Sequence, residues 1–91
     1  MKFEWNREKA ESNQKKHKVS FDEAQTVFDD PLFVVAADPD HSVEENRFII
    51  MGESKQQRLL VVSYTERPLA KRLISARKAT RLERKKYESD I

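Results

Sequence analysis

The chain contains 91 residues, of which 37% are hydrophobic and 37% are charged, and its net charge is +2. This balance predicts a single folded domain over residues 1–91, and the longest apolar run, Leu59–Val62, is too short to span a membrane. The chain has no cysteine, which excludes disulfides, thiol nucleophiles and cysteine-based zinc sites and is typical of a cytoplasmic protein.

The N-terminal segment predicts a short strand followed by a helix. Polarity alternates over Lys2–Trp5, as in a short edge strand. Asn6 is a suitable N-cap, because its side-chain oxygen can accept a hydrogen bond from the first turn of a helix. A polar helix is therefore expected to begin after Asn6 and to end at about His17.

A second helix is marked by a capping signal. Ser20 and Glu23 have the S-x-x-E spacing of a capping box, in which each side chain bonds the backbone of the other. Pro31 ends the helix, because the residue before a proline is disfavoured in the α region. The apolar residues at helical spacing, which define the predicted buried stripe, are Phe21, Ala24, Val27 and Phe28.

The chain beyond Pro31 predicts β-structure. Leu59–Val62 lacks polar alternation and is therefore expected to be a central strand with both faces covered. Short turn-rich connections favour antiparallel pairing between consecutive strands. The predicted strands are Leu32–Ala37, Arg47–Met51, Leu59–Tyr64 and Lys71–Ser75.

A C-terminal helix is predicted to begin at Ser75, with an inward face of Ala76, Ala79, Leu82 and Tyr87. The predicted fold class is α+β: two N-terminal helices, a four-stranded antiparallel sheet and a basic C-terminal helix, with a candidate short N-terminal edge strand.

Positive charge is concentrated near the C-terminus. Residues 67–86 carry nine Lys or Arg and a single acid, Glu83, which makes the net charge of this segment +8. Residues 1–66 carry nine Lys or Arg against thirteen Asp or Glu. The segregated charge indicates either a nucleic acid or an acidic protein partner, and charge alone leaves both open.

Three blocks of the sequence together resemble the BrnT family of type II toxins, over about residues 2–88. They run from FEWN to VFDDP (residues 3–31), from DPDHS to MG (residues 38–52) and from TER to YE (residues 65–88). The resemblance implies a small ribonuclease with a RelE-like fold that is held inactive by a BrnA-type antitoxin. It also implies a ribbon-helix-helix DNA-binding part in that antitoxin, repression of the operon by the complex, and a hetero-oligomer that we expect to be 2:2.

Two residues depart from the family pattern. Lys18 stands where the family's KHGVSF block has glycine, and a left-handed backbone at this position would cost lysine about 1 kcal/mol. Pro68 follows the TER block and stiffens the next turn. Neither change removes a functional group.

The candidate site residues have the chemistry of metal-independent RNA cleavage, which needs a base, an acid and cations around the phosphorane. Glu66 or His17 could take the 2′-OH proton, and His17, Lys16 or Tyr64 could donate one to the leaving oxygen. The predicted catalytic residues are Glu66, Arg67 and His17. The predicted RNA phosphate ligands are Lys16, Arg72, Arg77, Lys78 and Arg81, with Arg77 placed in the first turn of the last helix, where free amides favour an anion.

Other interpretations of these residues stay open. Without the resemblance, Glu66 beside Arg67 is a solvated turn pair and His17 caps the end of a helix. Trp5, Phe3 and Phe21 could stack on bases, but core packing is preferred. The alternative function is a non-catalytic nucleic-acid-binding or partner-docking module that uses residues 67–86.

No metal or cofactor is expected. Asp38, Asp40 and His41 include metal-ligand types, but turn chemistry explains this segment better, because no further ligand lies at suitable spacing. Gly52 is the only glycine, which excludes Gly-rich phosphate loops.

Overall fold

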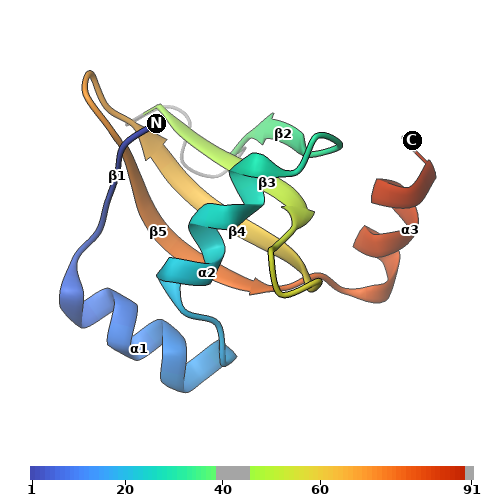
Figure 1. Ribbon diagram of the computed structural model, residues 1–91, viewed down its shortest axis with the longest axis horizontal. Coiled ribbons are helices and arrows are strands. Elements are labelled where there is room, and N and C mark those ends of the chain that lie inside the picture. The colour runs from blue at the N-terminus through green and yellow to red at the C-terminus, as the bar shows by residue number, and fades with distance from the viewer. Residues whose placement is uncertain (39–45, 90–91) are drawn as a thin grey trace.

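The protein is described by a computed structural model that covers residues 1–38 and 46–89 (Figure 1). Within these residues no helix is long and apolar enough to cross a membrane. The elements in chain order are β1 (Phe3–Glu4), α1 (Arg7–His17), α2 (Phe21–Gln25), the 3-10 helix η1 (Thr26–Asp29), β2 (Val34–Ala37), β3 (Arg47–Glu53), β4 (Leu59–Glu66), β5 (Lys71–Lys78) and α3 (Arg81–Ser89).

The sheet has five strands in the order β1-β5-β4-β3-β2. Strands β2 to β5 pair antiparallel as predicted, and β4 is the central strand, with Leu59–Val62 buried. The candidate N-terminal edge strand is confirmed as β1, but it pairs parallel to β5, so the sheet has five strands and is mixed and the prediction of a four-stranded antiparallel sheet is wrong. A parallel neighbour is allowed here because no tight turn joins β1 to β5. The α+β class is confirmed.

The two faces of the sheet are covered unequally. On one face, here called the helical face, α1, α2 and η1 pack on the main core, whose largest fully buried side chains include Phe21, Ile50, Leu60 and Leu73. All four residues of the predicted stripe of the second helix are buried there. The opposite face carries a smaller cluster of Met51, Leu59 and Val61, against which Tyr87 and Ala79 pack from the α3 side.

Helix α1 begins and ends as the sequence predicts. The Asn6 side chain accepts a hydrogen bond of 3.0 Å from the amide of Lys9. Lys18 ends the helix with φ = 60° and ψ = 33°, the left-handed conformation that glycine adopts with least strain. The Lys18 amide donates to the carbonyl of Gln14. The left-handed backbone therefore explains why the family has glycine at this position.

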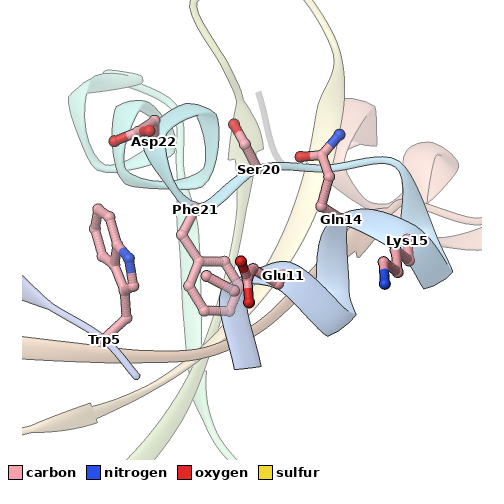
Figure 2. A pocket seen from close by; sticks show the side chains of 8 residues that line it. Trp5, Glu11, Gln14, Lys15, Ser20, Phe21 and Asp22 are labelled. Carbon is pink, nitrogen blue, oxygen red and sulfur yellow. The ribbon is translucent and has the colours of Figure 1, made fainter. Parts of the chain in front are cut away.

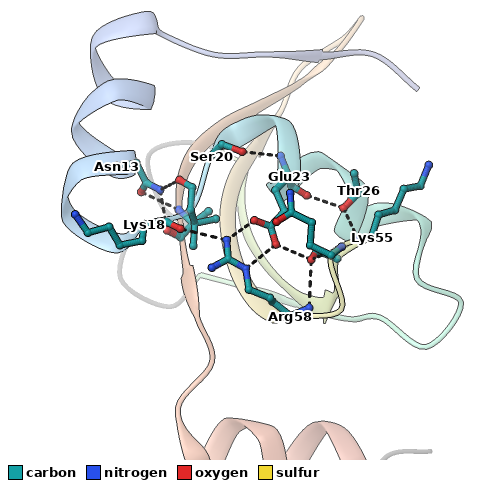
Figure 3. A network of polar contacts seen from close by, with 11 residues as sticks. Asn13, Lys18, Ser20, Glu23, Thr26, Lys55 and Arg58 are labelled. Atoms are coloured by element: carbon teal, nitrogen blue, oxygen red, sulfur yellow. Dashed lines mark hydrogen bonds and ion pairs between the residues drawn. The ribbon is translucent and has the colours of Figure 1, made fainter.

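Only half of the predicted capping box forms at α2. Ser20 Oγ accepts from the Glu23 amide at 3.0 Å, but the Glu23 carboxylate does not return a bond to Ser20. Instead it accepts from Ser54 Oγ at 2.6 Å and from Arg58 Nε at 2.9 Å (Figure 3). These bonds tie α2 to the β3–β4 turn, and the ion pair with Arg58 lowers the pKa of Glu23 despite its burial.

The last helix begins later than predicted. Ser75 and Ala76 belong to β5, because the antiparallel partner β4 extends as far as Leu59 and pairs with β5 up to Lys78. Thr80 caps α3 instead: its Oγ1 accepts from the Glu83 amide, and the Glu83 carboxylate accepts from the Thr80 amide. Leu82, predicted to face inward, is 78% exposed, whereas Tyr87 packs on the sheet as predicted.

Candidate nucleic-acid interface

The end of the β4–β5 hairpin, here called the Glu66 rim, brings a carboxylate and an ammonium together. Glu66 ends β4 and Lys71 begins β5, and the two are paired across the ladder. Lys71 Nζ donates to both carboxylate oxygens of Glu66 at 2.7 Å, and it also lies 5.4 Å from the centroid of the Tyr64 ring. The pair is partly open to solvent, so a ligand can reach a fixed negative group and a fixed positive group side by side.

Arg67 lies beside this pair in the turn. Its backbone amide and carbonyl exchange hydrogen bonds with Ala70, which holds the turn closed. Its guanidinium is exposed and has no ionic partner in the described chain. The adjoining hollow has a volume of 380 Å³ and is lined by Asn46, Thr65, Glu66, Arg67 and Pro68. The predicted pair Glu66 and Arg67 thus lies at an open site, but the partner of Glu66 is Lys71.

Tyr64 is not placed to donate a proton. Only 4% of its surface is exposed, and its ring packs against Phe28 and Phe48 on the helical face. Burial and the neighbouring charge of Glu66 raise the pKa of Tyr64. Tyr64 therefore packs beneath the Glu66–Lys71 pair and stays protonated.

His17 and Lys16 lie at the end of α1, along the outer edge of β5. They line a hollow of 250 Å³ together with Ile74 and Ser75. Ile74 and Ser75 are three and four residues along β5 from Lys71, a distance of about 10 Å or more at the rise of a strand. The structure therefore places His17 farther along β5, away from Glu66, and does not bring the two side chains together.

Asn13 holds this part of α1 against the sheet edge. Its amide group is buried and pairs with both backbone groups of Ala76: Nδ2 donates to the carbonyl at 2.8 Å, and Oδ1 accepts from the amide at 3.0 Å. Nδ2 also donates to the carbonyl of Val19 at 2.9 Å. Asn13 thus occupies the place of a neighbouring strand and closes this edge of the sheet, which positions His17 one turn later.

Arg72 and Arg77 lie on the face opposite the helical face. Residues five apart on a strand normally point to opposite faces, but the ladder shifts between Ser63 and Tyr64 so that Ile74 has no partner. This bulge turns both arginines to the same face. Each is already paired: Arg72 with Glu4 at 2.9 Å and Arg77 with both oxygens of Glu83 at 2.8 Å. Arg77 is also not in a helix, contrary to prediction.

Lys78 and Arg81 lie at the far end of the sheet. Lys78 ends β5 and Arg81 begins α3, and both are exposed. Lys78 lies seven positions after Lys71 in the strand, a distance of about 23 Å. The predicted phosphate ligands therefore do not form one cluster. They divide among the end of α1 (Lys16), the face opposite the helical face (Arg72 and Arg77) and the far end of the sheet with the start of α3 (Lys78 and Arg81).

Sequence reasoning missed Lys71 and Asn13 as parts of the site. Lys71 could have been found if β4 had been predicted to extend to Glu66, because residues paired across a short hairpin lie side by side. Asn13 carried no signal, since a polar residue in a polar helix is normally solvated.

The predicted preference for core packing of the N-terminal aromatic residues is confirmed. Phe3 packs 5.0 Å from Phe28, and Trp5 meets Phe21 edge to face at 5.9 Å between ring centroids. Trp5 and Phe21 form the floor of a groove of 390 Å³ between α1 and α2, whose rim includes Glu11 and Asp22 (Figure 2). Two carboxylates and one ammonium, that of Lys15, line this groove, so its net charge is negative and disfavours RNA.

The structure contains no cluster of three metal-ligating side chains within residues 1–38 and 46–89. Asp40 and His41, considered above as ligand types, lie outside the described residues. Asp38 is buried and its carboxylate lies 3.5 Å from Arg47 Nε.

Comparison with known proteins agrees with the resemblance seen in the sequence. The family model for the ribonuclease toxin BrnT of type II toxin–antitoxin systems matches residues 5–83. The chain is also similar to the 1.1 Å crystal structure of the Brucella abortus ribonuclease toxin BrnT, with 21% sequence identity and a TM-score of 0.70. That match covers 89% of this chain and 99% of the Brucella chain, and it supports a shared fold. No curated protein matches the sequence.

Proposed function

Because this chain belongs to the BrnT family of ribonuclease toxins of type II toxin–antitoxin systems, we propose that it cleaves RNA internally at the Glu66 rim without a metal ion. The observation that supports this site is the pairing of Glu66 with Lys71 beside the exposed guanidinium of Arg67, which has no ionic partner among the described residues. A base and a phosphate ligand, Glu66 and Arg67, thus line an accessible hollow, and the cation Lys71 is bonded to Glu66 beside it.

The proposed reaction is an attack by the ribose 2′-oxygen on the adjacent phosphorus. Glu66 takes the 2′-OH proton while the new O–P bond forms, and the bond from phosphorus to the 5′-oxygen breaks. The ammonium of Lys71 gives a proton to the departing oxygen, and Arg67 binds the phosphoryl oxygens with two parallel hydrogen bonds. The products are a 2′,3′-cyclic phosphate and a 5′-hydroxyl end.

His17 and Lys16 are proposed to bind a neighbouring phosphate, because they lie along the β5 edge at a distance from Glu66. Arg72 and Arg77 would have to exchange Glu4 and Glu83 for RNA, and Lys78 and Arg81 would contact a more distant part of the strand. His17 thus moves from the predicted catalytic group to a binding role.

The test is incubation of pure protein with labelled RNA in EDTA, with analysis of the product ends. We expect cleavage by the wild type and a loss of at least about 100-fold in Glu66→Gln and in Arg67→Ala, the usual scale for a general base or a transition-state cation. Glu53→Gln and Arg7→Ala, changes of the same kind at exposed positions away from the rim, are the matched controls. Full activity in both rim variants would refute the site, and activity only with added metal would refute metal independence.

The proposed partner is a BrnA-type antitoxin with a ribbon-helix-helix part. The two proteins form a 2:2 complex in the cytoplasm, and this complex represses their operon. We also propose that the fold, with its mixed sheet, is RelE-like. The +8 charge of residues 67–86 supports electrostatic steering of the antitoxin. Association should slow as salt rises, and a salt-independent rate would contradict this role of the charge. If the protein binds RNA but cleaves it neither alone nor in the presence of ribosomes, the alternative of a non-catalytic binding module is favoured.

A further inference from the structure

The two edges of the sheet differ in how their backbone groups are satisfied. At the β1–β5 edge, β1 covers the start of β5 and the Asn13 amide takes both backbone groups of Ala76. At the other edge, β2 pairs only with β3. The amide of Asp38 donates to the carbonyl of Arg47, so alternate residues of β2 bond toward β3. The amides and carbonyls of Val35 and Ala37 therefore point outward, and no described residue bonds them.

This open edge is apolar. Strand β2 has the sequence VVAA, with no charge or proline to protect its edge. Phe33 is 46% exposed and Val35 is 40% exposed. On the face opposite the helical face, the edge continues into a groove of 210 Å³ whose apolar lining is formed by Val34, Ala36, Ala37, Ile49, Met51 and Val61.

Helix α3 supplies the charge beside this groove. Lys86 and Glu83 complete the lining, but the Glu83 carboxylate is already bound by Arg77 and by the Thr80 amide. The ammonium of Lys86 is exposed and has no ionic partner among residues 1–38 and 46–89. An occupant of the groove is therefore matched in charge when it brings a carboxylate to Lys86.

We propose that β2 is the docking edge for an extended segment of the antitoxin, which adds a sixth strand to the sheet. Apolar side chains at alternate positions of that segment enter the groove, and an acidic side chain reaches Lys86. An unpaired strand edge selects a polypeptide, because only another backbone matches its alternating donors and acceptors. This inference rests on the proposed function only in naming the antitoxin as the partner.

A second copy of this chain fits the edge less well. Among the described acids that flank β2, Asp29 lies 3.8 Å from Lys55, Asp30 accepts from Tyr87, and Asp38 lies beside Arg47. Edge-to-edge pairing of two copies would therefore bring none of these three carboxylates to Lys86 unpaired.

The test uses proline to block the edge without touching the β2–β3 ladder. Val35→Pro removes an amide that points away from β3, and Ala37→Pro does the same two residues later. The probe is the cognate antitoxin, the partner that the type II toxin–antitoxin family implies, titrated against the full chain. We expect each proline variant to keep the wild-type circular dichroism spectrum and to bind at least about tenfold more weakly, since main-chain bonds contribute much of the affinity in strand addition. Val35→Thr, which retains the amide, should bind as the wild type does.

Two further measurements decide between occupants. Amide hydrogen exchange should show Val35 and Ala37 exchanging fast in the free chain and becoming protected in the complex. Lys86→Glu should weaken binding more than Lys85→Glu, because only Lys86 lines the groove. Folded proline variants that bind like the wild type would overturn the inference. So would failure of the wild type to bind the probe, or a wild-type homodimer that Val35→Pro dissociates.

The RNA assay keeps this inference separate from the proposed function. Binding at β2 by a chain that cleaves no RNA would refute the ribonuclease site and leave the docking edge in place. Cleavage by the wild type and by Val35→Pro alike, with loss of antitoxin binding in the variant, is the result expected if both hold.

Discussion

The carboxylate of Glu83 accepts two hydrogen bonds of 2.8 Å from the guanidinium of Arg77 and thereby joins the first turn of α3 to the end of β5, on the face opposite the helical face. The same carboxylate accepts from the Thr80 amide, so one side chain both caps the helix and neutralises an arginine. Helix α3 has no buried residue of its own, which makes such polar ties important for its position.

Glu83→Gln should loosen α3 and free Arg77. The variant loses an exposed ion pair and part of a cap, so we expect a cost of about 1 kcal/mol in unfolding free energy. The released guanidinium raises the positive charge of the face opposite the helical face, so RNA should bind more tightly. Urea denaturation and RNA titration measure the two effects, with Glu88→Gln, near the end of α3, as the control. Unchanged RNA affinity would exclude Arg77 as a phosphate ligand.

The same pair predicts an acid-sensitive attachment of α3. The bond from Arg77 lowers the pKa of Glu83 from its ordinary value of 4.5 to about 2. A lowered pKa in the folded state means that the carboxylate stabilises the fold fully above pH 4.5 and loses that contribution as the pH falls toward 2. Backbone amide shifts of α3 should therefore move between pH 4.5 and 2. A transition at ordinary glutamate pH would contradict the pairing.

The contact between Tyr87 and Asp30 predicts a loss of stability at alkaline pH. Burial, and then its 2.5 Å hydrogen bond to Asp30, raise the pKa of Tyr87 from 10.0 to about 12. The contribution of the neutral phenol is present below pH 10 and is lost as the pH rises through about 12. Tyr87→Phe should cost about 1 kcal/mol at neutral pH, the usual net value of one hydrogen bond. Ring resonances of Tyr87 followed by NMR would show the titration; one centred near pH 10 would refute the contact with Asp30.

Lys18→Gly should stabilise the protein. The left-handed conformation costs a side chain about 1–2 kcal/mol, and glycine returns part of that gain through its larger entropy when unfolded, which leaves about 0.5–1 kcal/mol. The Lys18 amide and carbonyl bonds, including the one from Arg58, are backbone bonds that glycine retains. Lys15→Gly, in the last turn of α1, should instead destabilise by about 1 kcal/mol. Equal effects of the two changes in urea denaturation would rule out strain at Lys18.

The Glu23–Arg58 pair should be the most sensitive polar contact. Glu23 is 4% exposed, and its charge is satisfied by Arg58 and Ser54. Glu23→Gln leaves the guanidinium without its counter-charge, so we expect a loss of about 3 kcal/mol. Glu11→Gln, on the exposed side of α1, should change stability by less than about 0.5 kcal/mol. Because its folded pKa is lowered, the contribution of Glu23 should fall as the pH drops below 4.5. A small loss in Glu23→Gln would mean that the pair is weakly coupled.

Features that depend on neighbours in the chain were predictable from the sequence. The caps at Asn6 and Ser20, the left-handed strain at Lys18 and the central position of Leu59–Val62 follow from side-chain chemistry and from short-range patterns. The α+β class and the family were also predictable, the former from the change in hydrophobic period and the latter from the order of its blocks.

The start of α3 could not be placed, because Ala76, Ala79 and Leu82 fit a helix as well as they fit a strand and a loop. The choice is made by β4, which offers pairing as far as Lys78, and by Asn13, which binds the backbone of Ala76. Neither contact can be inferred from the periodicity of the sequence, since β4 and Asn13 are both distant from Ala76 along the chain.

By itself, the sequence determined where the first two helices begin, which segments are extended, how charge is segregated and to which family the chain belongs, because each depends on local chemistry or on the order of residues. Only the tertiary structure decided that β1 runs parallel to β5, that a bulge at Ile74 turns Arg72 and Arg77 to one face, and that Lys71 rather than Arg67 pairs with Glu66. It also left β2 as the open edge. These outcomes depend on strand order and register, which are set by packing between segments far apart in the chain.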